Sequence, residues 1–371
     1  MTTTFAVVTG GGSAGHVLPA LAIAEALVDA GHEPGEIHYV GAARGLETTL
    51  LPATPFPHTF LDVVGLQREV NMPNLRRNAA FVPKLVTARR AAVRLLRRLR
   101  PAVVVSVGGY ASVPAVLAGR RLGIPIVVVS YDRRPGRASA LTARIAAATA
   151  VAYPDSPLPG AVVTGAPLRR RILNADRRRD RDGARQRLGL PADRFVIVVT
   201  GGSLGSAALN GAVVDYVSRH ADDGALAVRQ VVGERFLADA PVVKAPEDGV
   251  MHQVVGYDER AEDLYTAADL LVGRGGASTV AETAVTGTPA ILVPWSGAAE
   301  DHQTANVRWL ADQGGAILLP ESQLGQLGDH IDRLRADDEA RRQLAARAAR
   351  AGDQHRRGTL AGLIERVAAD A

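Results

Sequence analysis

The chain has 371 residues, of which 47% are hydrophobic and 22% charged, and it contains no cysteine. This composition excludes a disordered chain, disulfide bonds and thiolate metal sites, and the length predicts two globular domains of ordinary size. The net charge of +5 permits an anionic partner, but an aromatic content of only 4% argues against nucleic acid. Because no apolar run reaches about 18 residues and the sequence enters a strand directly after Thr4, we expect neither a membrane span nor a leader peptide.

The first motif is a strand, a glycine loop and a helix. Residues 5–9 are apolar and predict a buried strand, residues 10–16 read GGGSAGH, and residues 17–27 have helical periodicity with Pro19 in the first turn. Free N–H groups at such a turn suit an anion or a sugar. His16 is a candidate general base or hydrogen-bond donor, and the alternative is that it caps the helix.

Residues 71–100 are the most basic part of the first half and alternate apolar residues with arginines. This pattern is typical of a packed helix with a solvated charged face, or of a helix that lies on an anionic membrane surface. Further strands are predicted at 102–106 and 124–129. The second of these delivers Asp132 to the carboxyl edge of a sheet, where α/β proteins bind ligands; the alternative is an ordinary turn.

Arg169 follows a strand and a turn, which could direct it into a cleft. The charged run from 169 to 187 predicts a linker with a short helix. Within it, Asp180 and Asp182 indicate a solvated salt-bridging run rather than a metal clamp. A strand at 195–200, the loop GGSLGS and a helix from Ala207 then repeat the first motif, which suggests two α/β domains built on one plan.

A third glycine turn lies at 273–276, between a strand signal at 268–272 and a helix that should end near Gly287. Its geometry suits a phosphate, with Glu282 placed for ribose hydroxyls; the alternative is a capping box made by Thr279 and Glu282. Gln303 and Asn306 share a helix face and would suit sugar hydroxyls. Residues 338–371 should be helical, with a break at Gly352.

Together these motifs resemble the MurG family, the UDP-N-acetylglucosamine–N-acetylmuramyl-(pentapeptide) pyrophosphoryl-undecaprenol N-acetylglucosamine transferases. The resemblance rests on motifs in the family's order between about residues 5 and 320. They are GGSAGH at 11–16, GGY at 108–110, GAPLR at 165–169, GGSLG at 201–205, residues 274–282, and Gln303 with Asn306.

The resemblance implies a GT-B fold, with two Rossmann-like domains facing each other across a cleft, and no metal or cofactor. It implies an acceptor domain at 1–165, a linker at 166–192, a UDP-sugar domain at 193–350, and a helix at 351–371 that packs back on the first domain. The implied reaction is inverting transfer of N-acetylglucosamine from UDP-GlcNAc to lipid I, the undecaprenyl-pyrophosphoryl-MurNAc-pentapeptide, to give lipid II for peptidoglycan. The implied location is the cytoplasmic face of the cell membrane, peripherally on its anionic surface.

The resemblance also assigns roles to residues. His16 would be the catalytic base, and Ser13, Ala14 and Gly15 would face the transferred sugar and the acceptor. Arg169 would approach the nucleotide. The remaining substrate-binding residues are Asp132, Ser203, Tyr257, Ala277, Ser278, Thr279, Glu282 and Gln303.

This sequence departs from the family at residues 129–132, which read VSYD where the family has His-Glu-Gln-Asn, and at Ala14, where a glycine is usual. Three other functions therefore stay open. They are a GT-B transferase with another lipid or natural-product acceptor, a UDP-GlcNAc 2-epimerase, and a catalytically silent UDP-sugar binder.

Overall fold

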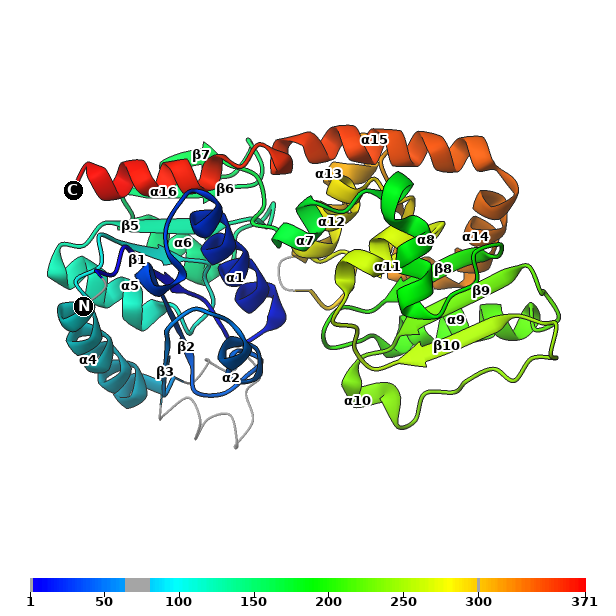
Figure 1. Cartoon of the computed structure of the whole chain (residues 1–371), viewed down its shortest axis with the longest axis horizontal. Helices are drawn as coiled ribbons and strands as arrows, with labels where there is room; N and C mark the ends of the chain where they lie inside the picture. The colour runs from blue at the N-terminus through cyan, green and yellow to red at the C-terminus, as the bar shows by residue number, and fades with distance from the viewer. Residues whose placement is uncertain (1–2, 64–80, 299–300) are drawn as a thin grey trace. The chain divides into compact units, whose positions relative to one another are not determined.

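The computed structural model describes residues 3–63, 81–298 and 301–371, which form two compact units (Figure 1). The first unit comprises residues up to Arg170 and the segment Arg357–Ala371, and the second comprises Arg171–Arg356. Within the described residues, no helix is both long and apolar enough to span a membrane.

The first unit is built on a seven-stranded parallel sheet in the order β3-β2-β1-β4-β5-β6-β7. Its central strands are runs of valine and other small apolar residues, buried on both faces as expected for a parallel sheet. The strands are β1 (Ala6–Thr9), β2 (Ile37–Ala42), β3 (His58–Leu61), β4 (Val103–Ser106), β5 (Ile126–Ser130), β6 (Ala148–Val151) and β7 (Ala161–Val163).

Helices cover this sheet, and one of them comes from the far end of the sequence. α16 (Thr359–Ala369) packs against α1 and against β4, β5 and β6. The other helices are α1 (Ala14–Asp29), α2 (Glu47–Leu50), α4 (Phe81–Leu99), α5 (Val113–Leu122) and α6 (Arg137–Ala143), with short 3₁₀ turns η1 (Pro34–Glu36) and η2 (Leu51–Ala53).

The second unit has a six-stranded parallel sheet in the order β10-β9-β8-β11-β12-β13. The strands are β8 (Phe195–Thr200), β9 (Leu226–Val231), β10 (Met251–Val255), β11 (Leu270–Arg274), β12 (Ala290–Val293) and β13 (Ile317–Leu318). The helices are α7 (Arg170–Leu173), α8 (Arg177–Leu188), α9 (Ala207–Arg219), α10 (Glu234–Leu237), α11 (Ala261–Ala267), α12 (Ala277–Thr286), α13 (His302–Ala311), η4 (Glu321–Gln326), α14 (Leu327–Ala336) and α15 (Asp338–Arg356).

The two sheets share one plan, since the first strand of each lies third from one edge and the chain steps outward on that side and then on the other. This confirms the predicted pair of Rossmann-like domains. In such sheets ligands bind at the carboxyl ends of the strands, near the point where the strand order reverses. The glycine loops after β1 and β8 lie at this point in their respective units.

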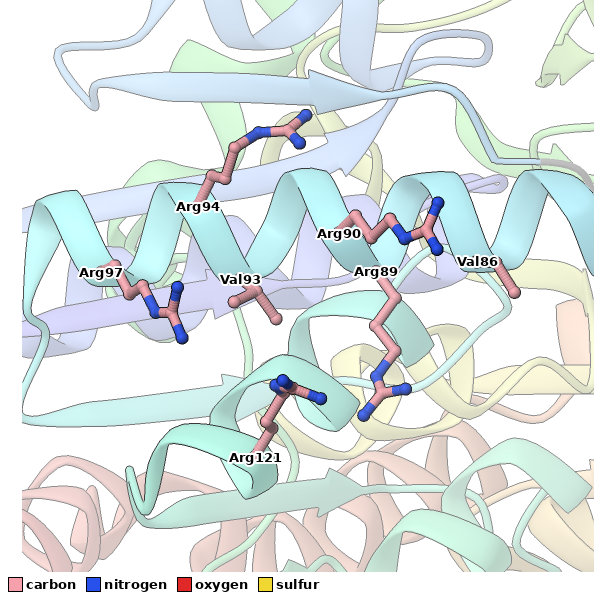
Figure 2. A pocket seen from close by; sticks show the side chains of 7 residues that line it. All are labelled: Val86, Arg89, Arg90, Val93, Arg94, Arg97 and Arg121. Carbon is pink, nitrogen blue, oxygen red and sulfur yellow. The ribbon is translucent and has the colours of Figure 1, made fainter.

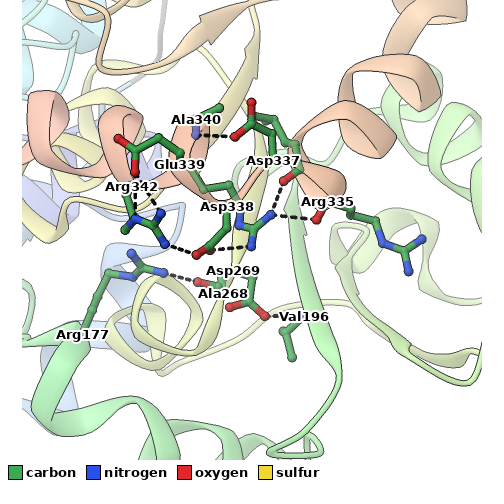
Figure 3. A network of polar contacts seen from close by, with 12 residues as sticks. Arg177, Val196, Ala268, Asp269, Arg335, Asp337, Asp338, Glu339, Ala340 and Arg342 are labelled. Atoms are coloured by element: carbon green, nitrogen blue, oxygen red, sulfur yellow. Dashed lines mark hydrogen bonds and ion pairs between the residues drawn. The ribbon is translucent and has the colours of Figure 1, made fainter.

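The charged segment expected as a linker is folded into the second unit. Asp176 caps α8 by accepting from the N–H groups of Arg178 and Arg179, and α8 packs against α11. Figure 3 shows Arg177 donating to the Ala268 carbonyl, beside Asp269, which accepts from Val196 N at 2.8 Å. Asp180 pairs with Arg179 at 2.7 Å, in keeping with the salt-bridging interpretation of this run.

The predicted helix break at Gly352 is wrong. α15 continues through Gly352 to Arg356, and the chain turns at Gly358 instead. A Cβ on Gly352 would lie 2.5 Å from the Ala284 carbonyl oxygen of α12, so this glycine serves the close approach of two helices. Helix α15 therefore belongs to the second unit and α16 to the first.

Candidate functional site

The loop after β1 holds His16 through the start of α1. Ser13 is the N-cap residue, so the helix begins at Ala14, three residues earlier than the sequence predicted. His16 thus lies in the first turn, and its Nδ1 is 3.0 Å from the hydroxyl of Ser13. The predicted alternative, in which His16 itself caps the helix, is wrong.

Pro19 lies inside α1 rather than in its first turn. A proline has no N–H, so the carbonyl four residues earlier, that of Gly15, loses its helical donor. The hydroxyl of Tyr131 donates to that carbonyl instead. The loop after β5, where this chain departs from the family, is thereby tied to the first turn of α1.

The charges around His16 oppose the effect of its burial. Burial lowers the pKa of His16, while the carboxylates of Asp132 and Glu47 act in the other direction. A lowered pKa leaves the ring neutral at pH 7, which is the form that can accept a proton. The two carboxylates would stabilise the ring once it is protonated.

Glu47 is a functional candidate that is not evident from the sequence. It is fully buried at the start of α2, and its Oε1 accepts from Gly12 N at 3.1 Å and from Ala42 N at 3.0 Å. The only signal in the sequence is a lone glutamate shortly after a buried strand and Gly45. Nothing in that local pattern predicts that it reaches a loop 35 residues away.

In the second unit, the loop after β8 leads into α9, which begins at Ala207 as predicted. Ser206 caps this helix by accepting from Leu209 N. Ser203 and Leu204 at the tip of the loop are exposed, so their backbone and the Ser203 hydroxyl are open to a ligand.

The helix α12 begins after Gly276, with its first turn formed by Ala277, Ser278 and Thr279. The predicted capping box is wrong, because Gly276 is the N-cap residue and no side chain caps the helix. Glu282 lies in the second turn rather than the first, and its Oε2 accepts from the hydroxyl of Tyr265 at 2.6 Å. Burial raises the pKa of Glu282, and the bond from Tyr265 opposes that rise.

Arg274, at the end of β11, connects three loops of the second unit and was not singled out from the sequence. It is buried, and it donates to the Ser206 hydroxyl, to Glu321 and to the Val293 carbonyl at 3.2 Å. Glu321 also accepts from Ser296 N at 3.0 Å. Arg274 therefore links the loop after β8, through Ser206, to Glu321, and through Glu321 to Ser296 in the loop after β12.

Gln303 and Asn306 do not act alike, although they share α13. Asn306 is fully buried and its amide donates to the Gly275 carbonyl at 3.4 Å, so it supports the turn before α12. The expectation that its amide meets a sugar hydroxyl is therefore wrong. Gln303 is only partly buried, and its Oε1 accepts from Trp295 N at 2.9 Å.

The other predicted residues have the following surroundings. Arg169 pairs with Glu25 of α1, with Arg169 Nη2 at 2.7 Å from Glu25 Oε1. Asp132 follows β5 and lies close enough to affect His16 electrostatically. Tyr257 follows β10, and 40% of it is exposed.

Comparisons with known proteins agree with this geometry. Residues 6–151 match the glycosyltransferase family 28 N-terminal domain, and residues 196–358 match the glycosyltransferase family 28 C-terminal domain. The UDP-N-acetylglucosamine–N-acetylmuramyl-(pentapeptide) pyrophosphoryl-undecaprenol N-acetylglucosamine transferase of Clavibacter sepedonicus is 36% identical to this chain over 362 residues. The match covers 96% of this chain and 95% of that protein. The one from a Nocardioides species is 40% identical over 320 residues, covering 86% of this chain and 85% of the relative.

A crystal structure of MurG from Acinetobacter baumannii is 25% identical, covers 99% of both chains and superposes with a TM-score of 0.71. The two parallel-sheet units with their glycine loops thus define a hexosyltransferase with the GT-B fold. More narrowly, the chain belongs to the MurG family of UDP-N-acetylglucosamine–N-acetylmuramyl-(pentapeptide) pyrophosphoryl-undecaprenol N-acetylglucosamine transferases.

Proposed function

We propose that this chain transfers N-acetylglucosamine from UDP-GlcNAc to lipid I and so forms lipid II of peptidoglycan. The observation that carries this proposal is full-length similarity to transferases of that name, combined with a histidine held at the mouth of the first glycine loop. The second unit supplies backbone N–H groups and a carboxylate, which are the kinds of group that bind a nucleotide.

The donor would be held by the second unit. Among the residues that the structure describes, no side chain caps α12, so the N–H groups of Ala277, Ser278 and Thr279 at its start suit the pyrophosphate, and the Glu282 carboxylate suits ribose hydroxyls. Ser203, Tyr257 and Gln303 would complete the site for the uracil and the sugar. When the sugar leaves, negative charge builds up on UDP, and the same N–H groups, helped by Arg169, would stabilise it.

The acceptor would react at the first unit. The C4 hydroxyl oxygen of the muramoyl sugar attacks the anomeric carbon of N-acetylglucosamine while the bond from that carbon to UDP breaks. Since Ser13 engages Nδ1 of His16, Nε2 is the nitrogen that would take the hydroxyl proton. Ala14, Gly15 and Asp132 would contact the sugars, with Asp132 in the place of the family's asparagine.

An arginine-rich groove on the first unit supports attachment to an anionic membrane. Figure 2 shows Arg89 and Arg97 of α4 and Arg121 of α5 pointing toward the space between the two helices, while Arg94 extends from the other side of α4. The groove is lined by Val86, Arg89, Arg90, Val93, Arg94, Arg97 and Arg121. None of the described residues that line it is acidic. Lipid phosphates would meet these guanidinium groups, each contributing about 1 kcal/mol near an anionic surface. Residues 71–80 of the predicted basic region lie outside the described residues.

The experiment for the reaction measures UDP release from UDP-GlcNAc with and without a lipid I analogue. We expect release only when the analogue is present, and its loss in a His16→Ala variant that still binds UDP-GlcNAc. Release without an acceptor would indicate hydrolysis instead. Binding without release would favour another acceptor or a silent binder, and Asp132→Asn would be the first reversion to try.

The membrane proposal is tested by flotation with vesicles of phosphatidylglycerol or of phosphatidylcholine. An Arg90→Gln/Arg94→Gln/Arg97→Gln variant should lose binding to the anionic vesicles by roughly a hundredfold, at about 1 kcal/mol for each of the three arginines. A variant with Arg342→Gln and Arg347→Gln on α15 removes positive charge from the second unit and should bind as the parent does. A loss in the α15 variant in proportion to its two removed charges would mean that only net charge matters.

A further inference from the structure

The carboxylate of Glu47 lies directly beneath the first glycine loop. Its exposed fraction is 0%, and it accepts hydrogen bonds from two backbone N–H groups, those of Gly12 and Ala42. Neither donor is charged. In the described part of the chain, no arginine or lysine forms an ion pair with Glu47, so hydrogen bonds from backbone amides hold its carboxyl group.

The glycines of the loop are shaped around this carboxylate. A Cβ on Gly11 would lie 2.3 Å from Glu47 Oε1, so a side chain there would collide with it. Gly12 has a φ of +91°, and a Cβ there would lie 2.7 Å from a ring carbon of Tyr110. The loop therefore approaches Glu47 from one side and Tyr110 from the other. Its path, and with it the position of Ser13 and His16, depends on both contacts.

The path of the glycine loop does not by itself require a charged side chain at residue 47. The amide oxygen of a glutamine can accept the same two N–H bonds, and burying a neutral group costs much less than burying a carboxylate. What a glutamine cannot supply is negative charge near His16. The charged groups that act on the His16 ring in the described residues are Asp132 and Glu47, and Glu47 in turn acts on Tyr39 and Tyr110.

We propose that Glu47 is a positioning residue for the transfer, holding the Gly11–Gly12 turn that carries His16 and stabilising the His16 imidazolium with its charge. The inference rests on the proposed function, because it takes His16 as the base. It adds a residue that never touches substrate and lies on a different helix from the histidine. Asp132 provides the second negative charge from the loop after β5.

The test compares Glu47→Gln, Glu47→Asp and Tyr39→Phe in the full chain. Glu47→Gln keeps the acceptor oxygen and removes the charge, whereas Glu47→Asp keeps the charge and shortens the reach by one methylene. Tyr39→Phe is the matched control, because Tyr39 donates to the Gly10 carbonyl of the same loop at 2.6 Å and carries no charge. The readouts are kcat, KM for each substrate, thermal unfolding, and the pH dependence of kcat/KM.

We expect Glu47→Gln to lower kcat by roughly 10- to 100-fold, a part of the ~10²–10⁴-fold that general-base catalysis contributes, because it keeps the loop in place and removes the charge that stabilises the imidazolium; the KM for UDP-GlcNAc should be unchanged. Without the Glu47 charge the imidazolium is less stable, so the acid limb of the profile should move to lower pH. Tyr39→Phe and Glu47→Asp should leave that limb in place. A parental kcat and profile in Glu47→Gln, or a loss of kcat with an unmoved limb, would overturn the inference.

If Glu47→Gln does not fold, the remaining variants still decide. Glu47→Asp must then show reduced kcat with the parental acid limb, and a parental kcat in Glu47→Asp would overturn the inference. The proposed function fails in a different way, since the parent protein itself would then release no UDP with the lipid I analogue. A parent that turns over while Glu47→Gln matches it in kcat and pH profile refutes only the role of Glu47.

Discussion

Replacing Arg185 with methionine should destabilise the second unit strongly. Arg185 has an exposed fraction of 1% although it carries a charge, and it connects α8 to the starts of β8 and β11. Its guanidinium donates to the carbonyls of Ala267 at 3.1 Å, Ala192 at 2.7 Å and Arg194 at 3.1 Å, and to Asp269 at 2.7 Å. Methionine keeps most of the aliphatic volume and removes every one of these bonds.

The size of the loss follows from what remains unpaired. Asp269 keeps its bonds from Val196 N and Arg181, so its carboxylate still has hydrogen-bond donors. The Ala267 carbonyl loses its donor in a buried place, and the carbonyls of Ala192 and Arg194 lose theirs in partly buried ones. Breaking one side of a buried charge network costs about 3–5 kcal/mol, and the retained partners of Asp269 favour the lower value, about 3 kcal/mol.

Tryptophan fluorescence measures this loss without interference from the first unit. The chain has two tryptophans, Trp295 and Trp309, and both lie in the second unit. With a urea m-value of about 2–3 kcal/mol/M, a loss of 3 kcal/mol lowers the midpoint of the fluorescence transition by about 1–1.5 M. Arg342→Met is the control, because Arg342 forms its ion pairs on the exposed face of α15 and should leave the midpoint unchanged.

A midpoint for Arg185→Met within about 0.3 M of the parent, less than 1 kcal/mol by the same conversion, would refute the reasoning. It would mean that water or rearranged side chains replace the guanidinium at those carbonyls. An equal shift in Arg342→Met would show instead that loss of positive charge, not loss of the buried network, controls the stability of this unit.

Three further results are expected. Glu282→Ala should weaken UDP-GlcNAc binding at least tenfold by calorimetry, since a charged hydrogen bond is worth about 1.5–3 kcal/mol; unchanged affinity would remove Glu282 from the donor site. Tyr131→Phe removes the bond to the exposed Gly15 carbonyl and should cost about 0.5–1.5 kcal/mol of stability; a melting temperature equal to the parent's would contradict this. Burial, and then Arg356, lowers the pKa of His355 to about 4, so the unfolded chain binds the proton more readily. The stability from neutral His355 is complete above about pH 6.5 and is lost as pH falls toward 4, by up to about 3 kcal/mol. His355→Gln should flatten the fall in stability across that window, and an unchanged slope would count against it.

Much of the fold was predictable because its signals are local. The strand, glycine loop and helix at 195–207 needed only an apolar run and the glycines that follow it, and the structure confirms each boundary. The end of α12 at Gly287 was read in the same way. These features depend on residues that are close in sequence, so local propensity and pattern decide them.

The misjudged features depend on contacts between distant segments. Gly352 was read as a break because propensity disfavours glycine in a helix, whereas it allows α15 to approach α12 closely. Glu47 reaches Gly12 only because β1 and β2 are neighbours in the sheet. Asn306 was assigned to a sugar because its type suited one, and burial beneath Gly275 gives it a supporting role.

The composition of the first unit bears on how the chain folds during synthesis. Its sheet is made first, yet α16, which packs on α1 and on three of its strands, is translated only after the whole of the second unit. The second unit is one continuous segment, so it can fold on the ribosome before the residues that follow it are translated. The unit that holds His16 thus reaches its final form last, and until then the apolar surface meant for Leu360, Leu363 and Ile364 stays open to water and to chaperones.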